Sequence, residues 1–154
     1  MSVVTPIPNR QRGIVAVETA IVLPLLLFLF VATAEVGRGF MQYNTLEKGV
    51  RDAARYLATN AINGFTGVID VTAAHETATK NLARYGNVTG TGDTLLPVYT
   101  AAMLAVDVPD ANHVTVIANY PYQPMLFDNL PSFGFGPDIS MLFTMRASVT
   151  VRAL

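Results

Sequence analysis

A single carboxylate, Glu18, lies inside a long apolar stretch of the sequence, five residues after Gly13. Two basic residues, Arg10 and Arg12, come just before that glycine. The 21 residues from Ile14 to Ala34 contain no other charged side chain. A charge at the centre of a membrane-spanning helix costs about 2.5–3.5 kcal/mol on insertion scales. Glu18 is therefore either an acid tolerated near a helix N-terminus, where the helix dipole favours it, or a group that needs a cationic partner.

Other reactive groups are sparse. The chain has no cysteine, and its two histidines, His75 and His113, are too few for a protein-only histidine cluster. We find neither a Gly-x-Ser-x-Gly elbow nor a His-Glu-x-x-His pair. The glycines of residues 86–92 lack the preceding strand and following helix of a phosphate-binding loop, and a net charge of −1 gives no case for nucleic acid. We expect no enzyme, no metal and no cofactor.

The apolar stretch is long enough to cross a membrane. About 20 helical residues cover the ~30 Å hydrocarbon core of a bilayer, and Ile14–Ala34 meets that length. Arg10 and Arg12 predict a cytoplasmic N-terminus by the positive-inside rule, which places the remaining chain outside the membrane. The alternative is an ordinary secretory signal cleaved after Ala32-x-Ala34. The helical pattern continues past that point, which argues against this alternative.

Beyond the apolar stretch, apolar residues recur at three- and four-residue spacing, as in an amphipathic helix. They are Val36, Phe40, Tyr43, Leu46, Val50, Ala53, Ala54, Leu57 and Ala61. We therefore predict one helix from Ile14 to about Ala61, on the order of 70 Å long at 1.5 Å per residue. Pro24 lies inside it and should kink or loosen it, because proline lacks the backbone N–H.

The remaining sequence predicts a small α+β domain. Asp70 or Thr72 can cap a second helix that runs through Tyr85 and ends at Gly86. Alternating apolar residues then predict three antiparallel strands. The alternation covers Leu104–Val108, Val114–Tyr120 and Met141–Val151, with the turn sequence PDAN between the first two. The fold class we expect is α+β, with the long helix packed on a second helix and a sheet of about three strands.

A segment rich in aromatic residues, proline and glycine connects the last two expected strands, so we predict a structured loop. Phe127, Phe133 and Phe135 within it could contact a partner or another subunit. Alternatively, the same side chains could cover the sheet edge or the core.

Several of these motifs together resemble a known family. A glycine, four small or apolar residues, a glutamate and then a long apolar helix resemble the processing site of type IV pilins. The sequence around this site resembles the TadE-like pseudopilins of the tight-adherence (Flp) pilus system. The similar segments are RGIVAVETAIVLPLLLFLFVATAEVGRGF and, further along the chain, VRDAARY. The resemblance covers roughly residues 10–58. Its most specific positions are Gly13, Glu18, Pro24, Glu35, Gly37 and Arg38.

The resemblance implies a processing step and a role for the carboxylate. A prepilin peptidase in the inner membrane would cut between Gly13 and Ile14 and create a new α-amino group on Ile14. In pilin-like assemblies the glutamate at the fifth mature position, here Glu18, is thought to pair with that amine on a neighbouring subunit. The implied partners are the peptidase, other pilins or pseudopilins, and the pilus assembly platform.

Residues and resemblance together predict four segments. These are a basic leader (1–13), a transmembrane helical half (14–35), an amphipathic helical half (36–61) and an extracytoplasmic α+β domain (62–154). The function we expect is that of a minor pilin or pseudopilin, a structural or assembly-initiating component of a pilus for surface adherence. The alternative is a single-pass, membrane-anchored envelope binding module that never enters a filament.

Overall fold

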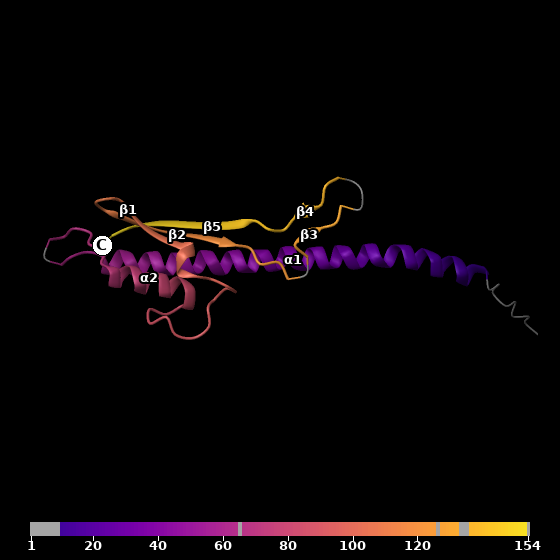
Figure 1. Cartoon of the computed structure of the whole chain (residues 1–154), viewed down its shortest axis with the longest axis horizontal. Coiled ribbons are helices and arrows are strands. Elements are labelled where there is room, and N and C mark those ends of the chain that lie inside the picture. The colour runs from indigo at the N-terminus through magenta and orange to yellow at the C-terminus, as the bar shows by residue number, and fades with distance from the viewer. Residues whose placement is uncertain (1–9, 65, 126, 133–135, 154) are drawn as a thin grey trace, which may run out of the picture. The chain divides into compact units, whose positions relative to one another are not determined.

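The computed structural model describes residues 10–64, 66–125, 127–132 and 136–153 (Figure 1). It divides into two compact units, Met1–Gly37 and Arg38–Leu154, and helix α1 (Arg10–Asn60) contributes residues to both. The predicted long helix is thus confirmed, with a start four residues earlier than expected and an end at Asn60. The α+β class is confirmed as well.

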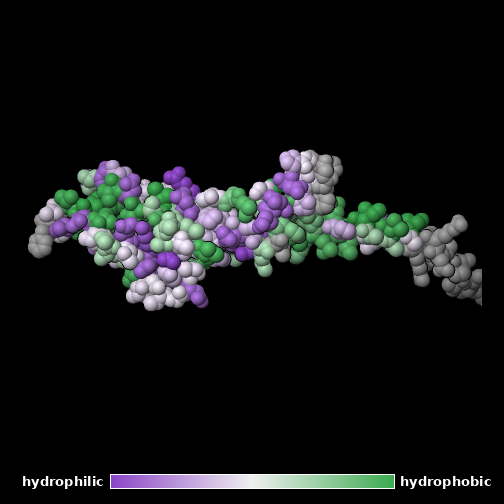
Figure 2. Space-filling model, viewed as in Figure 1, coloured by the Kyte–Doolittle hydropathy of each residue, from purple (hydrophilic) through white to green (hydrophobic). Residues whose placement is uncertain are grey.

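In the first unit, α1 is apolar around its whole circumference. Ile14, Val15, Val17 and Leu23 are all exposed, although they lie on different faces of the helix. None of the most apolar part of this helix is buried inside the protein, and Figure 2 shows it as hydrophobic surface. A helix that is apolar on every side is stable only where something other than water surrounds it.

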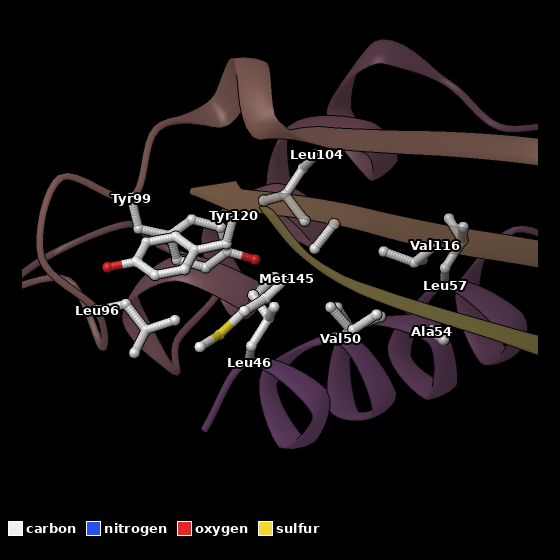
Figure 3. Close-up of a cluster of buried hydrophobic side chains, with 14 of the residues drawn as sticks. Leu46, Val50, Ala54, Leu57, Leu96, Tyr99, Leu104, Val116, Tyr120 and Met145 are labelled. Carbon is white, nitrogen blue, oxygen red and sulfur yellow. The ribbon is translucent and has the colours of Figure 1, made fainter. Parts of the chain in front are cut away.

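The second unit packs its part of α1 between a sheet and a second helix (Figure 1). The sheet has the order β1 (Leu104–Asp110), β2 (His113–Pro121) and β5 (Thr144–Arg152), and both pairings are antiparallel. Figure 3 shows side chains from α1 meeting those of the sheet. The buried apolar side chains that α1 supplies to this core are those of Leu46, Val50, Ala53, Ala54, Leu57 and Ala58.

The strands follow the predicted alternation with one shift. On β2, Val114, Val116, Ala118 and Tyr120 are buried, as expected for one face of a strand. The last strand begins at Thr144 rather than at Met141.

Met141, three residues before β5, takes part in a short hairpin rather than in the three-stranded sheet. The backbone N–H of Met141 donates to the carbonyl of Asp128 at 2.8 Å. That bond closes a short hairpin, in which β3 (Asn129–Leu130) pairs with β4 (Ile139–Ser140). The sequence predicted only a loop here.

The second helix, α2 (Ala73–Tyr85), has the predicted caps. The Thr72 hydroxyl accepts a hydrogen bond from the backbone N–H of His75 at 3.2 Å, which satisfies one free amide of the first turn. Gly86 ends the helix with φ of 73°, a left-handed conformation that glycine adopts without steric cost.

Two tyrosines close the core where the chain enters the sheet. Tyr99 and Tyr120 are buried and meet edge to face, with ring centroids 5.6 Å apart. The Tyr120 hydroxyl donates to the carbonyl of Pro97 at 2.9 Å. Burial raises the pKa of both phenols. A smaller opposite effect on each pKa comes from a nearby positive charge, that of Arg84 at Tyr99 and that of Arg38 at Tyr120.

The predicted apolar stripe of α1 is correct from Leu46 onward and wrong before it. Val36, Phe40 and Tyr43 are exposed, although the periodicity placed them on the packed face. At this level the face of α1 that meets the sheet carries Gly39 and Gln42 instead. A Cβ on Gly39 would lie 3.8 Å from the Tyr122 ring, and Gln42 is only 7% exposed.

Gly49 is the point of closest approach between α1 and α2. A Cβ placed on it would lie 2.7 Å from the backbone carbonyl oxygen of Ala83, a distance that real Cβ atoms essentially never show. Because a backbone atom blocks the space, no side-chain rotation can relieve the clash. The two helices can pack this closely only with glycine at position 49.

We expect Gly49→Ala to lower the free energy of unfolding by about 1–3 kcal/mol, because the added methyl forces the helices apart. Gly39→Ala is the matched control, since its Cβ would make only an ordinary contact, and alanine favours a helix interior by up to about 1 kcal/mol. Denaturant unfolding of the full chain in detergent measures both. Equal stability of the two variants would contradict the proposed close packing.

Candidate processing and assembly site

Glu18 and Ile14 lie one helical turn apart on the same face of α1. Both are exposed, and together with Gly13, Val17 and Ile21 they line a shallow, mostly apolar hollow on the helix surface. Four residues of helix rise separate the two, about 6 Å. Within residues 14–34 the carboxylate is the only charged group, and the hollow around it is otherwise apolar.

Gly13 has no packing role among the described residues. A Cβ placed on it would meet nothing within 4 Å, in contrast to Gly49. Its conformation is helical, so the fold does not require glycine for a left-handed turn either. The packing of the described residues therefore gives no reason for glycine at position 13.

The basic residues and the proline keep their sequence-based interpretations. Arg10 and Arg12 fall in the first turn of α1, and residues 1–9 of the expected leader lie outside the described residues. α1 continues through Pro24. The kink at Pro24 and the cytoplasmic N-terminus remain predictions.

Of the three loop phenylalanines, the structure describes one. Phe127 is 47% exposed, so about half of its side chain is covered, and both the contact role and the alternative that it covers the sheet edge remain predictions. It lies between β2 and β3, next to the hairpin. Phe133 and Phe135 lie outside the described residues, so their expected contact role remains a prediction.

Within the described ranges, no group of three or more metal-binding side chains occurs. The one contact between a carboxylate and a histidine, Asp110 to His113, is part of the turn between β1 and β2. The Asp110 carboxylate accepts from the backbone N–H of Asn112 at 2.8 Å and lies 2.8 Å from His113 Nδ1. These hydrogen bonds lower the pKa of Asp110, and the pair closes a turn at the surface.

Sequence reasoning missed one exposed apolar group in the second unit. Phe40, Met41, Ile139 and Leu142 all project into solvent. A signal was available for the first two, because they directly follow the membrane-length stretch, but the helical periodicity assigned Phe40 to the core.

The fold and this site define the class of protein: an α+β chain whose N-terminal helix is long and apolar enough to cross a membrane. A family model described as TadE-like protein matches residues 13–55 and confirms the resemblance. The match includes Gly13, Glu18 and Pro24, and it associates the chain in general terms with the tight-adherence pilus system. No curated protein and no solved structure matches the chain.

Proposed function

We propose that the chain is a minor pilin or pseudopilin of a tight-adherence pilus, processed by a prepilin peptidase between Gly13 and Ile14. The observation that carries the proposal is the position of Glu18, alone on an apolar helix face and one turn from the residue that cleavage would make the new N-terminus. The TadE-like match over residues 13–55 supports it.

Cleavage would change the electrostatics of this helix end. It removes Arg10 and Arg12 and gives Ile14 a positive α-amino group. In a single copy, Glu18 lies close enough to the helix end to reach the membrane interface, so the unpaired charge is tolerated. Once helices pack together away from the headgroups, the carboxylate needs a cation, and the amine of a neighbouring subunit supplies one. Glu18 then both recruits the next subunit and fixes its register.

In this proposal the membrane-spanning segment anchors the subunit in the inner membrane before assembly. The N-terminus is cytoplasmic in this proposal and the second unit is extracytoplasmic, as the two arginines favour. The residues after α1 form a larger domain than the major pilin of this system typically carries, which supports the minor role. An anchored module that never enters a filament is the outcome if processing fails to occur.

Substitution of Gly13 should block processing without affecting the fold. We expect Gly13→Leu to accumulate as full-length precursor, because a bulky side chain keeps the substrate backbone from the peptidase carboxylates. The matched control is Gly37→Leu, since a Cβ at Gly37 also meets nothing within 4 Å. Immunoblots of membrane fractions separate precursor from mature chain. Normal processing of Gly13→Leu would contradict the assigned cleavage site.

Removal of the carboxylate should separate processing from assembly. We expect Glu18→Ala and the isosteric Glu18→Gln to be cleaved normally but lost from sheared pili, because neither can bind the neighbouring amine. The control is Thr19→Ala, which alters the adjacent residue and leaves the charge in place. Immunoblots of sheared and membrane fractions measure both steps. Pili with the normal amount of Glu18→Ala would show that the pairing role is wrong.

A further inference from the structure

Exposed apolar side chains gather at one end of the second unit, the end at which its part of α1 begins. Phe40 is 66% exposed there, and Met41 beside it is also exposed. Leu142, just before β5, is 62% exposed. Apolar groups of this size are normally buried, so their clustering at one end calls for a physical explanation.

Direct contacts connect the start of α1 in this unit to the strand junction. A Cβ on Gly39 would lie 3.8 Å from the Tyr122 ring, so the helix meets the end of the sheet at this glycine. Tyr122 stacks on Phe143 with ring centroids 5.0 Å apart, and its backbone N–H donates to the Phe143 carbonyl at 2.9 Å. The junction where β2 ends and β5 begins therefore lies beside the first turns of α1 in this unit.

The β3–β4 hairpin extends from that junction. It lies beyond the ends of β2 and β5 (Figure 1), and the bond from Met141 to Asp128 closes its base. It adds the exposed side chains of Phe127 and Ile139. We call the whole exposed set the apolar collar; its members are Phe40, Met41, Phe127, Ile139, Leu142 and Phe143.

On the turn of α1 at the collar, polar side chains are buried and apolar side chains are exposed, the reverse of the usual arrangement in water. Gln42 is 7% exposed and its Oε1 has no hydrogen-bond partner among the described residues, while Nη1 of Arg38 is likewise buried and unpaired. Phe40 and Met41 on the same turn point outward. Polar groups inside and apolar groups outside are the arrangement of helices surrounded by lipid, whereas water favours the opposite.

The collar is also close to the membrane segment along the chain. Arg38 follows Ala34 by four residues, which span at most about 14 Å whatever the angle between the two units. Phe40 lies six residues past Ala34, about 9 Å of helix rise, and the headgroup layer on each side of the hydrocarbon core is about 5–8 Å deep. This rise places the Cα of Phe40 just past the layer, but helical side chains point back toward the helix N-terminus, so the side chains of Phe40 and Met41 reach into the layer.

We propose that the apolar collar contacts the lipid bilayer, with its side chains in the interfacial layer on the side where the second unit lies. This goes beyond the pilin proposal, because it requires only that Ile14–Ala34 spans the membrane. Amphipathic surfaces that carry Phe and Leu on their apolar side bury these groups about 5–10 Å into this layer. The contact would hold the second unit against the membrane before any assembly.

The charges near the collar indicate that the contact is apolar. Asp128 precedes the hairpin and Asp138 lies within its loop, so this end carries no excess of cations to attract anionic headgroups. A second copy of the chain could cover the same side chains. We favour lipid because Phe40 and Met41 follow the membrane-length stretch along the chain by only a few residues and, like it, have exposed apolar side chains.

The chain contains no tryptophan, so a single introduced indole reports on one position. We expect Leu142→Trp, in full-length chain reconstituted into phosphatidylcholine vesicles, to lose about half of its emission when the lipids carry bromine near the interface, the depth expected for interfacial side chains. Phe40→Trp provides a second collar position should Leu142→Trp misfold. Raising the salt concentration should leave the quenching unchanged, because charge does not drive the contact.

Val68→Trp is the control, because Val68 is similarly exposed, at 58%, and lies beyond the far end of α1. About 33 Å of helix rise separates Arg38 from Asn60, so the control should show no bromine quenching. Equal quenching of the collar and control variants would overturn the proposal. So would a blue-shifted collar indole that brominated lipid does not quench, since that result assigns the collar to a protein contact.

Discussion

The apolar surface of residues 14–34 must be removed from water by something other than this chain, and the rest of the structure depends on that constraint. None of that surface is buried by the protein's own atoms. Only lipid or the helices of other subunits can cover it. In the proposed assembly, lipid would surround Glu18 before its subunit is inserted and protein would surround it afterwards, and the free energy of its charge differs between the two surroundings.

α1 is one helix with two chemical environments. In the second unit its small residues let a sheet and α2 pack closely on opposite sides, to the point that Gly49 almost touches the backbone of Ala83. In the first unit the most apolar part of the same helix is not buried, and a Cβ on Gly13 would meet nothing within 4 Å. The fold therefore explains Gly49, whereas the packing of the described residues gives no reason for glycine at position 13. The same holds for Glu18, which is exposed and packs against none of the described core.

Periodicity and capping residues predicted the regular elements of the fold. The span of α1, the Thr72 and Gly86 caps of α2, and the alternation on β2 were all correct. The β3–β4 pair was missed because two-residue strands have no measurable alternation. The exposure of Phe40 was missed because periodicity finds an apolar face without saying whether protein or lipid covers it. The close approach at Gly49 depends on a neighbour more than thirty residues away, which no local pattern contains.

The central claim is that cleavage gives Ile14 a free amine one turn from Glu18. Intact-mass measurement and N-terminal sequencing of the wild-type protein from the membrane fraction test it most directly. The account predicts a mature chain that begins at Ile14. A chain that retains Met1, or one that begins at Glu35 as an ordinary secretory signal would produce, would contradict it.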